Sequence, residues 1–253
     1  MDDKQQIQSK EYQFPYHYIP AVQGSKFQLS RRWAFAPSYL AALQITHEWL
    51  EKLTKDKPAD TWRHIDLGCG DGAFVYYLKQ MINIAEIEFS GTDYDESAIV
   101  WARLFNPENT FYCDKVEALQ KERYHSATLV EVAEHIPPDL LPDFAKAIAD
   151  VLVKDGELLV TVPHKNKRLF DKHYQHFSFD SLSSVFEPYF EVLDIKGFES
   201  LGWRNRMVKR FMSNKRIYVE WQGLSTYFVK SMAKMYSSEK QAGRIVMKLR
   251  KLG

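Results

Sequence analysis

The segment Glu131–His135 (EVAEH) places two carboxylates and an imidazole within five positions. It directly follows an apolar run, residues 127–130, that predicts a buried strand. Side chains of these types can accept a proton from a reacting group, or they can bind a divalent metal ion. We therefore expect a reactive site where this strand leaves its sheet, with Glu131, Glu134 and His135 as candidate catalytic residues.

Three further histidines, His164, His173 and His176, follow the next predicted strand. We expect this stretch to be a loop over the same edge of the sheet. A neutral alcohol is a poor nucleophile and needs a base, a metal ion or both. Either His135 alone, or carboxylates and imidazoles together, could meet that need.

A glycine-rich turn, residues 66–72 (DLGCGDG), follows the first predicted strand of the alternating region. Glycines allow a tight turn and a close approach of ligand to backbone. The spacing is GxGxG, and Asp66 precedes it. A carboxylate in that place repels a phosphate but attracts an ammonium group.

Two more carboxylates stand at the ends of the next two predicted strands. Asp93 is at the end of the second, where an acidic residue can bind ribose hydroxyls in nucleotide-binding folds. Asp114 closes the third, where it could accept from an adenine amino group. Each alone is more often a turn or capping residue. Three successive strand ends carrying carboxylates favour an adenosine site.

The elements that position these residues are strands alternating with helices. Such alternation predicts an α/β fold with a parallel sheet covered on both faces, whose ligands lie beyond the carboxyl ends of the strands. The predicted strands are residues 62–68, 86–93, 109–114, 127–132, 156–163, 190–199 and 243–251, and the predicted helices are 40–54, 72–82, 95–105, 138–152 and 179–189.

We expect residues 1–56 to form an N-terminal arm and helix, and residues 57–253 to form the core domain. The boundary follows the polar, proline-containing segment 55–60 (KDKPAD). The arm is rich in aromatic residues, and we expect it to close as a lid over the site. A basic helical insertion is expected at about residues 202–240, before the last strand.

Composition limits the class of protein. The chain has 253 residues, 45% of them hydrophobic, which suffices for a large core. It has no apolar run long enough to cross a bilayer and no signal-peptide pattern at its start. Cys69 and Cys113 form no CxxC pair, which argues against a thiolate metal site. We expect a cytoplasmic protein, with peripheral contact to the inner membrane face as an open alternative.

The charge is unevenly distributed. Residues 204–253 carry thirteen basic and two acidic side chains, a net charge of +11, whereas the whole chain carries +1. A basic region of this kind predicts an anionic partner, whether nucleic acid, a phospholipid surface or a phosphorylated substrate. A solvated helical face would explain the charge equally well.

The segments DLGCGDG, GTD and ATLVEVAEHI resemble the class I S-adenosylmethionine-dependent methyltransferases over about residues 62–199 and, more weakly, the terminal strand. The resemblance implies a Rossmann-like, mostly parallel seven-stranded sheet with an antiparallel last strand. It implies that Asp66 and the glycine turn hold the methionyl part and that Asp93 holds the ribose. The full set of implied cofactor-binding residues is Asp66, Gly68, Cys69, Gly70, Asp93, Tyr94, Asp114, Lys115 and Glu131.

The pattern ExxEH followed by a distal histidine is similar to the metal site of the small-RNA 3′-end 2′-O-methyltransferases. The resemblance implies that Glu131, Glu134, His135 and His176 bind a divalent cation such as Mg²⁺ or Mn²⁺. Methyltransferases of the ubiquinone-biosynthesis type carry a similar ExxEH in which Glu and His order a loop without metal. Both interpretations remain open at this point.

The acceptor that we favour is a hydroxyl of a sugar or glycan, either free or linked to lipid or phosphate. The later loop and the N-terminal FPYHYIP look like those of bacterial surface-glycan and secondary-metabolite methyltransferases, and Tyr16, Tyr18 and Trp33 could stack on sugar rings. The alternatives are an RNA 2′-hydroxyl, O- or N-methylation of a small molecule, and a non-catalytic cofactor-binding scaffold. The combination of a cofactor site with an acid and histidine cluster argues against the scaffold.

Overall fold

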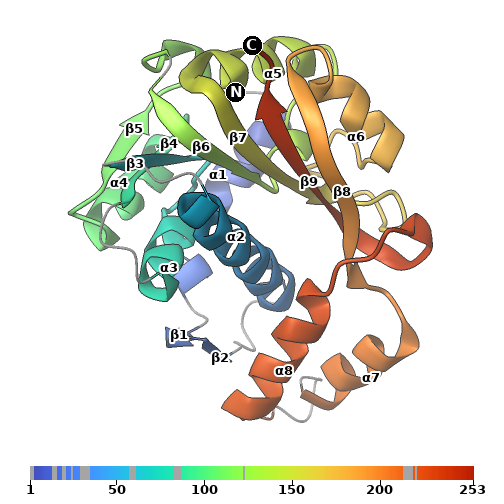
Figure 1. The fold of residues 1–253 in the computed structure, drawn as a ribbon. Helices are drawn as coiled ribbons and strands as arrows, with labels where there is room; N and C mark the ends of the chain where they lie inside the picture. Colours follow the sequence, from blue (N-terminus) through green and yellow to red (C-terminus); the bar gives the residue numbers. More distant parts are fainter. Residues whose placement is uncertain are drawn as a thin grey trace.

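The computed structural model describes residues 3–12, 16–18, 21–23, 25–28, 35–56, 61–82, 87–121, 123–212, 219 and 221–253 (Figure 1). Within these ranges a seven-stranded sheet has the order β5–β4–β3–β6–β7–β9–β8. Its strands are β3 (Trp62–Leu67), β4 (Ile87–Asp93), β5 (Thr110–Cys113), β6 (Tyr124–Val130), β7 (Leu152–Pro163), β8 (Phe190–Ser200) and β9 (Ala242–Lys251). The pairs from β5 to β7 are parallel, and β9 is antiparallel to both of its neighbours. The predicted sheet, with its antiparallel last strand, is confirmed.

Helices cover both faces of the sheet (Figure 1). One face carries α2 (Ala36–Asp56), α3 (Ala73–Met81), α4 (Glu96–Phe105) and α8 (Gln222–Ala233), and the other carries α5 (Leu141–Val151) and α6 (Phe179–Phe186). Successive strand residues face opposite layers. In β7, for example, Leu159 packs with the first group and Leu158 and Val160 pack with the second. Strands covered on both faces read as continuous apolar runs, which is why the sequence revealed them.

Element boundaries differ from the prediction where polar residues enter the sheet. Strand β6 begins at Tyr124 and β7 at Leu152, earlier than their apolar runs indicated. Ser126 in β6 is fully buried, and its hydroxyl accepts a hydrogen bond from Trp62 Nε1 at 2.8 Å. Helix α5 begins at Leu141, later than predicted, and has a proline in its first turn.

The N-terminal region contains α1 (Asp3–Glu11), the 3₁₀ turn η1 (Tyr16–Tyr18) and a small hairpin of β1 (Ala21–Gln23) and β2 (Lys26–Gln28). Helix α2 contributes a buried stripe to the same hydrophobic cluster as α3 and α8. Phe27 in β2 is also fully buried. By contrast, α1 has no buried residue.

Two helices, α7 (Trp203–Met212) and α8, lie between β8 and β9, in the segment that the sequence predicted to be helical and basic. Short 3₁₀ turns are found at η2 (Val116–Ala118), η3 (Ala133–His135) and η4 (Glu239–Gln241). In the part of the chain that the structure describes, no helix is both long and apolar enough to cross a membrane.

Candidate active site

The glycine turn between β3 and α3 has a backbone that favours glycine. Gly68, Gly70 and Gly72 have φ angles of 71°, 53° and 76°, in the left-handed region. A Cβ at Gly70 would lie 2.5 Å from the Tyr12 hydroxyl, and one at Gly68 would lie 2.5 Å from a Val132 methyl. Glycine is therefore required here for both conformation and space.

Asp93 fixes this turn from the end of β4. Its Oδ2 accepts a hydrogen bond from Gly70 N at 2.9 Å, and its Oδ1 accepts one from Asp95 N at 2.9 Å. Burial raises the pKa of Asp93 to about 6. A carboxylate has about four lone-pair sites, so Asp93 retains capacity to accept from the hydroxyls of a ligand.

Asp66 ends β3 on the floor of the site and is 3% exposed. Burial raises the pKa of Asp66 to about 7, against the lowering effect of a hydrogen bond from Thr128 Oγ1 at 2.7 Å. Thr128 donates its only proton to Asp66, so the contact at 3.3 Å between Thr128 Oγ1 and His64 Nε2 requires the His64 ring to donate. His64 Nδ1 then accepts from Ser126 Oγ at 2.8 Å. A directed chain of hydrogen bonds thus reaches Asp66 from inside the sheet.

Of the other predicted cofactor residues, some lie on the surface after β5 and others line a cavity. Asp114 and Lys115 are exposed after β5, and Tyr94 is 45% exposed. These three residues and Asp93 lie outside the lining of the cavity described next. Cys69 lines that cavity, and burial raises the pKa of its thiol.

A cavity of about 710 Å³ lies at the carboxyl edge of the sheet. The glycine turn, the segment after β6, the loop after β7 and the N-terminal arm all contribute to its wall. The lining residues are Ile7, Gln8, Glu11, Tyr12, His17, Phe35, Tyr39, Asp66, Gly68, Cys69, Gly70, Asp71, Phe74, Val130, Glu131, Glu134, His135, Phe170, Asp171, Lys172, His173 and Arg244.

Helix α1 and Tyr12 join the two ends of this cavity. Lys4 Nζ donates to the backbone oxygens of Asp171 and His173, at 2.7 and 2.8 Å. At the end of α1, Glu11 forms an ion pair with Lys172 at 2.7 Å. Tyr12 lies against Gly70, and its carbonyl accepts from Trp101 Nε1 at 2.9 Å. The arm therefore contacts the histidine loop and the glycine turn at once.

The aromatic residues that we expected to stack on a sugar are placed differently. Tyr18 stacks on Phe105 with ring centroids 4.3 Å apart, and its hydroxyl donates to Asp71 O at 2.9 Å, so it packs outside the cavity lining. Trp33 and the side chain of Tyr16 lie outside the described residues. Within the described chain, aromatic rings reach the cavity from Tyr12, Phe35, Tyr39, Phe74 and Phe170.

Glu131 belongs to a buried charge network. It has a positive φ of 57°, unusual for a residue other than glycine. Its carboxylate accepts from Thr161 Oγ1 at 3.1 Å and from Arg244 Nε at 2.7 Å. Arg244 also pairs with Glu199, which binds Lys167 at 3.0 Å. Two acids and two bases thus balance one another beside the cavity. Burial lowers the pKa of Arg244, but the charges of Glu131 and Glu199 together outweigh burial and raise it.

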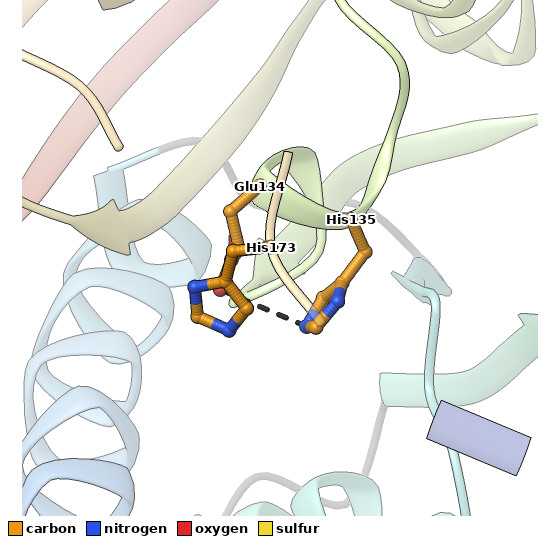
Figure 2. A group of neighbouring side chains, drawn as sticks. All are labelled: Glu134, His135 and His173. Carbon is orange, nitrogen blue, oxygen red and sulfur yellow. Dashed lines mark ion pairs between the residues drawn. The ribbon is translucent and has the colours of Figure 1, made fainter. Parts of the chain in front are cut away.

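Glu134, His135 and His173 converge on one point (Figure 2). One ligand atom from each lies within 4.8 Å of the other two, and His135 Nε2 is 4.0 Å from Glu134 Oε1. Glu134 is 1% exposed, and its Oε2 has no hydrogen-bond partner among the described residues. Burial, and next the charge of Glu131, raise the pKa of Glu134 well above its ordinary value.

The hydrogen bonds of the histidines orient their free lone pairs. His135 Nδ1 lies 3.2 Å from Lys172 O, and His176 Nδ1 lies 3.2 Å from Lys167 O. Carbonyls only accept, so both Nδ1 atoms donate. His176 Nε2 then accepts from His173 Nδ1 at 2.9 Å. Burial lowers the pKa of His135 to about 4 and that of His173 to about 2. Both rings are therefore neutral at pH 7, each with an unprotonated Nε2.

The group that the structure assembles differs from the predicted metal ligands. Glu134 and His135 are brought together as expected, but His173 joins them in place of Glu131 and His176. Glu131 is held instead by Arg244 and Thr161, and His176 stands behind His173 as its hydrogen-bond partner. The sequence placed both histidines on one loop, but the resemblance pointed to His176, three positions after the histidine that joins the cluster.

Arg244 and the α1 residues were not foreseen as part of the site. Arg244 approaches Glu131 because β9 inserts between β7 and β8, which the order of the sequence does not reveal. Helix α1 has a polar sequence without helical periodicity, so it gave no signal.

Comparisons with known proteins agree with this geometry. A family model described as a methyltransferase domain matches residues 31–193. No curated protein sequence matches the chain. Among solved structures, magnesium protoporphyrin IX methyltransferase (ChlM) from Synechocystis PCC 6803 with bound SAM is similar at a TM-score of 0.59 and 15% identity, over 99% of this chain and 98% of that chain.

Two further structures share the fold at lower coverage. A SAM-dependent methyltransferase from Archaeoglobus fulgidus has a TM-score of 0.53 and 15% identity, over 81% of this chain and 94% of its own. The N-methyltransferase NodS from Bradyrhizobium japonicum WM9 has a TM-score of 0.52 and 10% identity, over 82% and 95%. The family match covers most of the chain, and the chain therefore belongs to the methyltransferase-domain family, on the fold of the solved SAM-dependent methyltransferases.

Proposed function

We propose that this methyltransferase moves the methyl group of S-adenosylmethionine to a hydroxyl of a sugar or glycan, and that a divalent cation held by Glu134, His135 and His173 takes part. One observation carries the proposal. Two imidazole lone pairs and an unpartnered, buried carboxylate oxygen converge on the cavity that also contains the glycine turn. A hydroxyl acceptor needs such help, because it is a poor nucleophile while it holds its proton.

The glycine turn and its carboxylates fit the cofactor. Asp66 is a buried acid on the cavity wall, and the ammonium group of S-adenosylmethionine would supply the positive charge it lacks. Asp93 has acceptor sites to spare for two ribose hydroxyls. The glycine backbone at Gly68 and Gly70 allows the close approach that a buried ligand needs. Binding would then order the donor next to Glu134 and His135.

The donor set also fits a metal. Two imidazoles and one carboxylate suit Mn²⁺ or Fe²⁺ and leave coordination positions open for a ligand. A metal bound there would lower the pKa of a hydroxyl and orient it for in-line attack. The chain contributes the rest: Lys172 O fixes the His135 ring, His176 fixes the His173 ring, and burial keeps both rings neutral.

The cavity lining supports a sugar as the acceptor. Phe35, Tyr39 and Phe170 present aromatic rings that can stack on the apolar face of a pyranose. Arm residues from Ile7 to His17 form part of the cavity wall, so the acceptor would enter as a terminal unit of a longer molecule, such as a lipid- or phosphate-linked glycan. Vicinal hydroxyls of ribose could also reach the cation, so RNA is the competing acceptor to be tested.

The experiment is methyl transfer from labelled S-adenosylmethionine to three classes of acceptor: glycans, lipid-linked sugars and small RNAs. We expect label in a stable methyl ether on a sugar, and much less of it with the Asp93→Ala enzyme at a cofactor concentration below saturation. Label found only on RNA, or on a nitrogen atom, would contradict the proposal that the acceptor is a sugar or glycan hydroxyl. Stoichiometric cofactor binding without turnover on any acceptor, including simple amines and alcohols, would contradict the enzyme itself.

A further inference from the structure

Helix α7 presents an apolar stripe to solvent. Trp203, Met207 and Phe211 are 75%, 58% and 63% exposed. Residues four positions apart lie on one face of a helix, so the three side chains form a continuous ridge along α7. Single exposed apolar residues are common on protein surfaces. Three in successive turns of a peripheral helix are typical of a surface that binds a partner (Figure 1).

The opposite face of α7 is anchored, which fixes the ridge outward. Met212 is 4% exposed, and Val208 packs against the core cluster. Asn205 Nδ2 donates to Ser200 O at 3.1 Å, and Asn205 Oδ1 accepts from Ser231 Oγ of α8 at 3.2 Å. Rotating the helix to bury the ridge would break these contacts.

Positive charge accompanies the ridge on both sides. Arg204, Arg206, Lys209 and Arg210 are all exposed, and α7 contains no acidic residue. The neighbouring helix adds further side chains of the same two kinds, namely Trp221 (63% exposed), Tyr227 (55% exposed) and the exposed Lys230 and Lys234.

We infer that α7 docks onto the surface of an anionic lipid bilayer. In that position Trp203, Met207 and Phe211 would insert at the boundary between headgroups and acyl chains, while Arg204 and Arg206 extend to the headgroup phosphates. The apolar ridge matches the acyl chains of the bilayer, and the cations beside it match the anionic headgroups.

Other partners match only part of this surface. A second copy of α7 would bring Arg204 and Arg206 against the same two cations of its partner, which opposes self-association. Single-stranded nucleic acid is held in a basic groove with stacking platforms, whereas Met207 and Phe211 stand on a convex helix. If the proposed function holds, docking would bring the cavity to the compartment of lipid-linked acceptors, but the docking itself does not depend on that function.

The test is co-sedimentation of the full chain with vesicles of phosphatidylcholine alone or mixed with phosphatidylglycerol. We expect binding to the mixed vesicles only, weakened about tenfold or more by Arg204→Glu with Arg206→Glu. The triple variant Trp203→Ser, Met207→Ser, Phe211→Ser should lose binding. The matched control is Val100→Ser with Leu104→Ser on α4, an exposed apolar pair (56% and 64%) one turn apart and without the basic cluster, which should bind as the unmodified protein does.

Circular dichroism and S-adenosylmethionine affinity establish that each variant is folded, independently of any acceptor. Vesicle binding unaffected by both α7 variants would overturn the inference. So would a wild-type protein that ignores anionic vesicles, whether it binds single-stranded RNA through α7 or dimerises through it in sedimentation velocity. Loss of methyl transfer with vesicle binding intact would count against the proposed function and leave the docking surface standing.

Discussion

The contact that we propose between Asp66 and the ammonium group of S-adenosylmethionine would couple cofactor binding to pH. Its folded-state pKa, raised by burial to about 7, lies above its ordinary value of 3.8. An acid with a raised folded-state pKa costs stability as pH rises through that interval, because the unfolded chain releases its proton first. A bound ammonium group lowers the pKa of Asp66 again, because it favours the charged carboxylate.

We expect the affinity for S-adenosylmethionine to rise with pH and to level off above about 7. Below that value the affinity should fall by about tenfold per pH unit, since binding requires the loss of one proton. Calorimetric titration across this range is the measurement. Asp66→Asn should bind weakly and lose this pH step, and Thr128→Val should move it to higher pH because one stabilising hydrogen bond is gone. A pH-independent affinity in the unmodified protein would exclude an Asp66–ammonium contact.

Asp93 gives a second prediction at this scale. Replacing it with Ala would remove the acceptor that we propose for the ribose hydroxyls, and also the acceptor of the hydrogen bond from Gly70 N. Hydrogen bonds to a charged group contribute about 1.5–3 kcal/mol, so the dissociation constant for S-adenosylmethionine should rise by about 10- to 150-fold. Equilibrium dialysis on a protein shown to be folded measures this. Asp143→Ala, at an exposed position on α5, is the control, and an unchanged affinity in Asp93→Ala would remove Asp93 from the cofactor site.

At the residue level, the sequence predicted where the acidic residues and His135 lie in the fold better than it predicted which side chains they contact. Asp66, Asp93, Glu134 and His135 follow strand ends, and strand ends of a parallel sheet meet at one edge. The partner of Glu131, however, is Arg244, which is 113 positions away and arrives through the inserted last strand. Such long-range pairings depend on topology, so local pattern could not supply them.

At the scale of elements, the sequence predicted the alternation of strands and helices because the central strands β3, β6 and β7 are largely buried on both faces. The arm was not. Helix α1 makes polar contacts through Lys4 and Glu11 to the histidine loop, and only the folded protein brings those residues together. Helix α2, which the sequence grouped with the arm, packs in the core cluster.

Removing residues 1–12 therefore tests the arm as a lid without disturbing the core. Phe27 and α2 remain, α1 contributes no buried residue, and Tyr12 is the one buried side chain among residues 3–12, so the unfolding temperature should fall only slightly. Methyl transfer should fall by about a hundredfold or more, because the wall formed by Glu11 and Tyr12 would be gone and the reactants less well aligned. Differential scanning calorimetry and single-turnover rates measure the two effects. Full activity in the truncated protein would exclude a lid role.

On the scale of the whole molecule, the basic C-terminal region contains two groups of cations: ion-paired arginines on β9 and exposed cations on α7 and α8. Arg244 and Arg250, on β9, pair with carboxylates of neighbouring strands, with Arg244 in the charge network beside the cavity. The cations of α7 and α8 instead lie on an outer surface next to exposed aromatic residues. A count of charges along the sequence could not separate these roles, because the sheet buries one group and leaves the other in solvent.

The cavity joins these scales, because the glycine turn, the histidine loop and the arm all contribute to its wall. We propose that Glu134, His135 and His173 of this cavity hold a divalent cation. The most direct measurement is titration of the metal-free, full-length protein with Mn²⁺, followed by calorimetry and by electron paramagnetic resonance.

We predict one tightly bound Mn²⁺ per chain, lost in His173→Ala and in Glu134→Gln but retained in His164→Ala, a buried histidine of the same loop outside the cluster. Chelation should stop hydroxyl methylation, and added Mn²⁺ should restore it. Absence of Mn²⁺ binding, together with chelator-resistant turnover that His135→Ala abolishes and His173→Ala spares, would contradict the claim and identify His135 as a base that acts alone.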